Sequence, residues 1–298
     1  MRRWIKRIAW LLIAIALLVI GTAATGLLMA QRKLDRRVDV QVAPIVLPTD
    51  AASLEHGRYL FLSRGCAECH GANGGGREFI NDGKGMRAAG PNITPGGVTA
   101  KYAVVDWVRT VRQGVKPDGR PVFIMPSEDF NRLTDADLGA LVAYLKSLPP
   151  LPARAAVFEI PVPVRALYGF GVITDAAAKI DHGLPPAQPV PKAVTPAYGA
   201  YVANMCMGCH GAGLSGGRIP GGPPDWPPAA NLTPGAGSVM GRYASAEAFV
   251  AMLRSGKRPD GTSIPVMPFG SLAVLDDTDA RAVYAYLQTV PARPAGQR

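Results

Sequence analysis

The chain has 298 residues, a length that suits two domains of ordinary size, and only 18% of its residues are charged. Its formal net charge of +10 comes mostly from the N-terminus, because residues 1–37 contain eight Lys or Arg and one Asp. The rest of the chain has no basic stripe with interleaved aromatic residues, so nucleic acid is not an expected partner.

The N-terminal region, residues 1–37, contains an uncharged run from Ile8 to Ala30 with basic residues on both sides. As a helix, at about 1.5 Å per residue, this run is long enough to cross a bilayer. We therefore expect residues 1–37 to be a single membrane anchor with a cytoplasmic N-terminus. A cleaved signal peptide is the alternative, since the small residues near Ala23 and Ala24 resemble a cleavage site.

Residues 50–150 contain three segments that predict helices. Ser53 is placed to cap the first, Gly114 to stop the second, and Thr134 to cap the third. Apolar side chains gather on one side of the third segment, and loops rich in Gly and Pro separate the three. This pattern predicts a small all-α domain, whose expected helices cover residues 54–65, 104–113 and 134–149.

Residues 151–194 are rich in proline. The stretch VFEIPVPVRALYGFGVIT at 157–174 is apolar and aromatic, so we expect it to pack over the first domain as an extended strap. The stretch GLPPAQPVPKAVTP at 183–196 predicts a semi-rigid linker of polyproline type.

Residues 195–292 repeat the first domain. Residues 112–145 align without a gap to residues 254–287, and both copies contain Arg-x-Gly, Pro-Asp-Gly and Tyr-Leu at matching places. In the second copy Thr195 is placed to cap the first helix and Gly256 to stop the second. The expected fold is therefore two tandem all-α domains after an N-terminal transmembrane helix.

Each copy carries one five-residue motif, CAECH at 66–70 and CMGCH at 206–210, and together they use all four cysteines. Disulfides or a zinc centre would also use cysteines, but neither explains a His directly after each pair. CxxCH is the attachment signature of c-type haem, in which two thiols bond to the macrocycle and the imidazole binds iron. We predict two covalent haem c groups, attached through Cys66, Cys69, Cys206 and Cys209, with His70 and His210 as iron ligands.

A methionine is the expected sixth ligand of each iron, because Met raises the reduction potential relative to a second His. Met125 and Met267 each precede a proline and lie 55 and 57 residues after the attachment histidines. No other methionine both has a counterpart in the second copy and lies far enough from its motif. We therefore predict Met125 and Met267 as axial ligands.

The order of helix, CxxCH, loop rich in Gly and Pro, helix, Met-Pro and final helix resembles class I cytochrome c. The NITP and NLTP loops further resemble the membrane-bound multihaem cytochrome c subunits that serve periplasmic dehydrogenases. The resemblance covers roughly residues 50–150 and 195–292. Many such subunits carry three haem motifs, whereas this chain has two. The resemblance implies haem domains in the periplasm, held at the inner membrane and supplied by a dehydrogenase.

Two functional classes remain. In the first, the chain is an electron carrier and not an enzyme, passing electrons from a dehydrogenase or other donor to a downstream cytochrome or terminal oxidase. In the second, it is a dihaem enzyme of peroxidase or thiosulfate-oxidising type, with one exchangeable iron position. Only His56 and His182 are spare histidines, and no cysteine is spare. Because each copy offers a methionine, we expect the carrier.

Two pairs of smaller features each allow two interpretations. The NITP loop at 92–95 and the NLTP loop at 231–234 could contact the haem edge, or could simply build turns. Arg112 and Arg254 could pair with haem propionates, or could lie exposed at helix ends.

Overall fold

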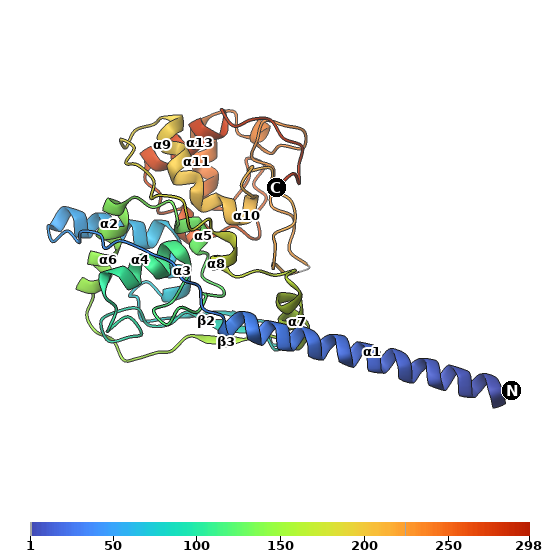
Figure 1. Cartoon of the computed structure of the whole chain (residues 1–298). Coiled ribbons are helices and arrows are strands. Elements are labelled where there is room, and N and C mark those ends of the chain that lie inside the picture. The colour runs from blue at the N-terminus through green and yellow to red at the C-terminus, as the bar shows by residue number, and fades with distance from the viewer. Residues whose placement is uncertain (1, 224) are drawn as a thin grey trace.

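In the computed structural model, which describes residues 2–223 and 225–298, a long N-terminal helix projects from a body of two helical domains (Figure 1). Helix α1 runs from Arg2 to Asp35 and is almost entirely exposed. Its length and apolar composition are sufficient to cross a membrane. The helix therefore has the properties that the sequence predicts for an anchor.

The first domain is built from five helices around one core. Its longest helices, α2 and α6, pack against each other, and Leu60, Phe61 and Leu138 are almost fully buried between them and their neighbours. Gly57 allows this close approach, because a methyl group there would lie 2.1 Å from the carbonyl oxygen of Ala140. The helices are α2 (Ala51–Ser63), α3 (Cys66–His70), α4 (Val104–Gln113), α5 (Ser127–Phe130) and α6 (Asp135–Ser147).

The ends of these helices mostly follow the expected signals. Helix α4 has the predicted bounds and ends at Gly114, which has a φ of 64°. Thr134 caps α6 by accepting a hydrogen bond from the backbone N–H of Asp137. The cap of α2 differs from the prediction. Asp50 caps this helix, and Ser53 only donates hydrogen bonds to the Asp50 side chain. A carboxylate accepts from both the Ser53 backbone N–H and its hydroxyl, so the helix begins three residues earlier than expected.

The expectation of an all-α fold was too strict, because the first domain also carries a small antiparallel sheet. Its strands are β1 (Glu78–Asn81), β2 (Arg87–Ala89) and β3 (Val157–Glu159), in the order β1-β2-β3. The first two strands lie in the long loop after α3, and the third comes from the strap. Phe158 in β3 packs on Phe123, with ring centroids 4.5 Å apart, so the strap both pairs with the sheet and covers the domain.

The strap is not extended throughout, as the sequence suggested, because it contains helix α7 (Val162–Phe170), and helix α8 (Ala176–Lys179) follows it. Proline in the first turn favours the start of α7, and Gly171 ends it with a φ of 84°. Helix α7 packs along the end of α1 nearest the body (Figure 1). Gly26 and Gly169 bring the two backbones together, so the anchor and the strap form one unit.

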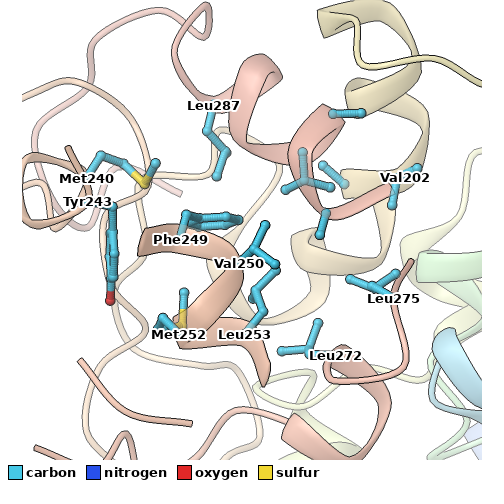
Figure 2. Packing of buried hydrophobic residues seen from close by; sticks show 14 of the residues in the cluster. Val202, Met240, Tyr243, Phe249, Val250, Met252, Leu253, Leu272, Leu275 and Leu287 are labelled. Carbon is cyan, nitrogen blue, oxygen red and sulfur yellow. The ribbon is translucent and has the colours of Figure 1, made fainter. Parts of the chain in front are cut away.

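The second domain has the same plan. Its helices are α9 (Pro196–Val202), η1 (Ala203–Cys206), α10 (Met207–His210), η2 (Met240–Arg242), α11 (Ala246–Ser255), α12 (Phe269–Leu272) and α13 (Asp277–Leu287). As predicted, Thr195 caps α9 and Gly256 follows the end of α11. Helix α9 packs on α13 as α2 packs on α6, with Gly199 against the carbonyl of Ala282. Figure 2 shows the core of this domain, where Phe249 lies among side chains from α11, α12 and α13.

Candidate haem sites

Both CxxCH motifs fold as single helical turns that follow a longer helix. Helix α3 follows α2, and Gly65 between them has a φ of 83°, a conformation that glycine adopts without strain. Helix α10 follows α9 through the short 3₁₀ turn η1. Residues three apart on a helical turn share a face, so both cysteines of each motif project to the same side. This arrangement suits two bonds to one planar group.

The two attachment histidines have the same hydrogen-bond partner type. Nδ1 of His70 lies 3.0 Å from the carbonyl oxygen of Pro91, and Nδ1 of His210 lies 2.8 Å from that of Ala230. Because a carbonyl oxygen only accepts, each Nδ1 carries the proton and each Nε2 keeps a lone pair for a metal. Burial also lowers the pKa of both histidines, which favours the neutral ring that binds a metal. Both imidazoles are thus oriented as metal ligands are.

The four thiols are unpaired and do not resemble a redox-active dithiol site. Burial raises the pKa of both Cys66 and Cys206 to about 12 and that of Cys69 to about 11. A redox-active CxxC site lowers the pKa of its attacking thiol instead. Among the described residues, no group of three or more His, Cys, Asp or Glu side chains is placed to hold a metal ion. The disulfide and zinc alternatives therefore have no support in the structure.

The second domain contains a cavity that is partly open to solvent. Cys206, His210 and Met267 all line it, which brings three of the four predicted residues of this copy to one site. The other walls are mostly apolar and include Phe249, Leu253 and Leu272, which Figure 2 labels. Apolar walls with a few converging polar groups are typical of sites that bind organic ligands. The lining therefore fits the apolar faces of a macrocycle.

Two arginines, Arg242 and Arg258, also line this cavity, and sequence reasoning had not singled them out. Arg258 is held in place by hydrogen bonds from its Nη1 to Thr262 and Ser263, each 3.0 Å long. Guanidinium groups beside an apolar cavity suit a macrocycle that carries carboxylates. The repeat offered a signal for Arg258, because Lys116 is the basic residue at the matching place in the first copy.

Met267 is one of three methionines at the cavity, together with Met205 and Met252. The repeat distinguishes them, because the matching positions of the first copy hold Met125 for Met267, Gly65 for Met205 and Thr110 for Met252. Met125 and Cys66 both pack against the core of the first domain. Methionine therefore occurs at matching positions of both sites only at 125 and 267.

The site of the first domain carries a buried donor without a partner. Trp107 occupies the position that Phe249 holds in the second domain, and its indole Nε1 is buried with no hydrogen-bond partner among the described residues. A buried unpaired N–H is costly, so such a group calls for an acceptor that is missing from the protein chain itself. The carboxylates of a haem would supply one, so the first site also fits the group.

The arginines at the ends of the middle helices pair with acidic residues at the start of the last helices. Arg112 donates to Asp135 at 2.6 Å and is buried, while Arg254 pairs with Asp277 and remains half exposed. Arg254 is not among the residues that line the cavity. Each ion pair holds two helices of one domain together. Two further nitrogens of Arg112, Nε and Nη2, are buried without a hydrogen-bond partner among the described residues, so a propionate partner for Arg112 stays a prediction.

The NITP and NLTP loops are turn builders. Asn92 accepts from the backbone N–H of Thr94 at 2.8 Å and donates to the carbonyl of Leu151 at 2.9 Å. Asn231 makes the matching turn and donates to the carbonyl of Arg293 at 2.8 Å. Each asparagine therefore ties the loop after the CxxCH motif to the segment that follows the last helix.

The spare histidines are engaged away from the sites. His56 lies 2.7 Å from a carboxylate oxygen of Asp137. His182 contacts the side chain of Gln113 through one ring nitrogen and the carbonyl of Ala177 through the other. Neither histidine is placed as an additional iron ligand, which removes the main structural support for a dihaem enzyme.

Comparisons with known proteins agree with this geometry. A family model described as "Cytochrome c" matches residues 54–149, and one described as "Cytochrome C oxidase, cbb3-type, subunit III" matches residues 193–287. The chain is 28% identical over 283 residues to the fructose dehydrogenase cytochrome subunit of Gluconobacter japonicus, covering 83% of this chain and 55% of that protein.

Two further relatives are cytochrome c subunits. One is the alcohol dehydrogenase (quinone) cytochrome c subunit of Gluconobacter oxydans, 26% identical over 83% of this chain and 57% of the relative. The other is the gluconate 2-dehydrogenase cytochrome c subunit of Pantoea cypripedii, 27% identical over 83% of this chain and 61% of the relative. The chain thus spans little more than half the length of these relatives. It has two cytochrome c domains that each bind a covalent haem c, and it is similar to the cytochrome subunits of dehydrogenases.

Proposed function

We propose that the chain transfers electrons through two haems, each held by two cysteines and ligated by one histidine and one methionine. The observation that carries this proposal is the repeated geometry of His70 and His210, whose Nδ1–H groups both donate to a carbonyl. This bond fixes the tautomer and orients each ring, leaving Nε2 as the metal ligand. Met125 and Met267 are the proposed ligands on the opposite faces.

When bound, a haem c with His and Met ligation supplies a one-electron couple between ferric and ferrous iron. The protein provides attachment through its cysteines, orientation through its histidines and a dry environment through its apolar walls. In the second domain Arg242 and Arg258 are proposed to neutralise the carboxylates of the macrocycle. The chain is accordingly proposed to be an electron-transfer subunit and not an enzyme.

We further propose a dehydrogenase as the electron donor and a downstream cytochrome or terminal oxidase as the acceptor. The donor proposal is supported by the names of three relatives, each a cytochrome subunit of a dehydrogenase. Helix α1 is proposed to anchor the chain in the inner membrane, with both haem domains in the periplasm. Four basic residues flank its uncharged run on each side, and the free amino group tips the balance toward a cytoplasmic N-terminus.

The ligand proposal is tested by optical spectroscopy on the purified protein with its haems. We expect the oxidised form to show charge transfer from methionine to both irons, and the reduced form not to bind carbon monoxide. Carbon monoxide binding at one iron of the unaltered protein would contradict the proposal and would indicate an enzyme with an open site.

A pair of variants in one cavity sharpens this test. Met267→Ala should remove one charge-transfer band and open one iron to carbon monoxide, because it deletes a proposed ligand. Met205→Leu is the matched control, since Met205 lines the same cavity without a counterpart in the first copy. If Met205→Leu opens the iron and Met267→Ala does not, the ligand assignment in this domain is wrong.

A further inference from the structure

The two domains meet through a contact with approximate twofold symmetry. The hydroxyl of Tyr59 in α2 accepts from the backbone N–H of Asp276 at 3.1 Å and donates to Asp279 at 2.8 Å. Tyr201 in α9 occupies the matching position and makes the matching contacts at the start of α6, where it donates to Asp137. Each domain thus inserts one tyrosine into the first turn of the other domain's last helix.

Both haem-attachment motifs lie in this contact. Glu68, inside CAECH, accepts from the hydroxyl of Ser271 at 3.1 Å and lies directly against Gly270. Gly208, inside CMGCH, lies directly against the carboxylate of Asp129. Ser271 belongs to α12 and Asp129 to α5, the short helices that follow the two Met-Pro segments. Each attachment motif therefore packs beside the segment that follows the methionine of the other domain.

The symmetry breaks at one residue, Arg64, which lies two positions before Cys66. Its guanidinium donates to Asp279 across the contact at 2.8 Å, and the two side chains are 6% and 0% exposed. The matching residue of the second copy is Asn204, which is neutral and donates to a backbone carbonyl at 2.7 Å. The contact therefore has an arginine at this position on one side only.

Arg64 lies beside both attachment motifs. It belongs to the first domain, yet it lines a small cavity of about 260 Å³ together with Asn204 and Met205, the two residues that directly precede Cys206. Burial raises the pKa of both Cys66 and Cys206, and the positive charge of Arg64 opposes this rise at both thiols. One fixed cation is thus near the attachment points of two haems.

A buried ion pair is an expensive way to join two surfaces, because desolvation offsets most of the attraction. Apolar side chains of similar volume would hold the domains as well. A fixed positive charge near an iron, however, disfavours the ferric state relative to the ferrous state, because the ferric state carries one more positive charge. In a buried contact this effect is screened only weakly by salt.

We propose that Arg64 is a positioning residue shared by the two haem sites. With Asp279 it fixes the two domains in one relative orientation, and its charge raises the reduction potential of both irons. This inference rests on the proposed function, because it requires a His- and Met-ligated haem in each domain.

The test is a potentiometric titration of the full-length protein with both haems, followed by their optical absorbance. Arg64→Gln should lower both midpoint potentials, and Arg64→Lys, which keeps the charge, should leave both near their original values. Arg58→Gln is the matched control, because Arg58 lies on the same helix in an exposed pair with Glu55. It should change neither potential. Asp279→Asn removes the negative partner and should lower neither potential.

A purely structural role for Arg64 predicts a different pattern. In that case Arg64→Gln and Asp279→Asn would shift the potentials in the same direction, because both break the same contact. If Arg64→Gln does not fold, the double variant Arg64→Gln/Asp279→Asn, which leaves no buried charge unpaired, replaces it, and both of its midpoints must lie below those of Asp279→Asn. A shift of only one potential, or of none, overturns the proposal.

Failure of the Arg64 proposal can be distinguished from failure of the proposed function. If the unaltered protein lacks two methionine-ligated haems, the proposed function fails before any variant is made. If it has both and Arg64→Gln leaves its potentials unchanged, only the role of Arg64 is wrong.

Discussion

The two cytochrome c domains share their internal framework but differ in what surrounds it. Each packs its first helix on its last through a glycine, and each ties its loop down with a buried asparagine. Among the described residues, however, only the first domain carries a sheet, a strap and a contact with the anchor helix. Only the first has an arginine two residues before its motif, where the second has Asn204.

This comparison separates two kinds of requirement. The repeated features are those that hold a helix, a thiol pair and an imidazole in one geometry, so they are needed wherever a haem is attached. The features found once concern the place of the protein in a larger assembly: its attachment to α1 and the junction between its domains. Differences between the copies therefore indicate where each domain meets something other than its own haem.

The largest expected effect tests whether the two sites are independent. Met125→His and Met267→His should each lower one reduction potential, by a measurable part of the roughly 0.8 V range that axial ligands cover. Potentiometric titration of both variants checks this. Equal shifts of both potentials in either variant would show that the domains do not act as separate redox sites.

The next effect concerns the two aspartates that receive the interdomain tyrosines. Asp279→Asn leaves the buried Arg64 without a counter-charge and should reduce the free energy of unfolding by about 3–5 kcal/mol. Asp137→Asn only weakens hydrogen bonds from His56 and Tyr201, for about 1–3 kcal/mol. Thermal unfolding measures both. Equal losses would mean that the contact is symmetric in energy as well as in shape.

Acid should loosen the same contact. Burial acts to raise the pKa of Asp279. The charge of Arg64 and hydrogen bonds from Arg64, Tyr198 and Tyr59 outweigh burial and hold this pKa below the ordinary value. A carboxyl whose pKa is lower in the folded state stabilises the fold above its unfolded pKa, near 3.9, and loses this contribution as pH falls further. Unfolding temperatures between pH 5 and pH 3 should therefore fall less steeply in Asp279→Asn than in the unaltered protein.

The shared framework gives matched effects in both domains. A methyl group at Gly57 would lie 2.1 Å from the carbonyl oxygen of Ala140, and one at Gly199 would lie 1.9 Å from that of Ala282. Gly57→Ala and Gly199→Ala should each destabilise their own domain by about 1–3 kcal/mol, because the two helices must move apart. Calorimetry of the two variants should give similar losses. A tolerated substitution in one domain would show that its helix pair packs more loosely.

The smallest effect lies at the start of the middle helices. Ser245 caps α11 through its hydroxyl, whereas Ala103 at the start of α4 has no side-chain oxygen. Ser245→Ala should cost about 1 kcal/mol, and Ala103→Ser should stabilise the first domain by up to about 1 kcal/mol. Denaturant unfolding of each variant checks the two signs. If Ala103→Ser is neutral, the hydrogen bond from its own N–H to Asp106 already satisfies this end of the helix.

Sequence reasoning placed most helices correctly because their signals are local. The middle helix of the first domain has its predicted bounds, since a glycine with positive φ stops it whatever lies nearby. The strap was harder to predict. Its apolar residues are compatible with either an extended or a helical backbone, and contact with Gly26 on α1 favours the helix. The strand Val157–Glu159 likewise exists because β2 offers it an edge.

The residues of the cavity likewise divide into those that a local sequence signal predicts and those that only the fold brings there. CxxCH and Met-Pro are chemical signatures that can be read one residue at a time. Arg242 gave no such signal, and Arg258 gave only the weak one that Lys116 is basic at the matching place, because an arginine becomes a site residue only when the fold turns it toward the cavity. The propionate role considered for Arg112 stays a prediction, because Asp135 pairs with one of its nitrogens while two others are buried without a partner among the described residues. Arg254 is half exposed in its pair with Asp277 and does not line the cavity.

By itself, the sequence determined that this protein has two copies of one haem-binding unit, because thiol and imidazole spacing follows from covalent chemistry and helix ends follow from the backbone of single residues. Only the tertiary structure decided how the two units face each other. Burial of Arg64 against Asp279 joins residues 215 positions apart in the chain, and no local pattern records such a contact. Interactions of that range depend on the packing of whole domains.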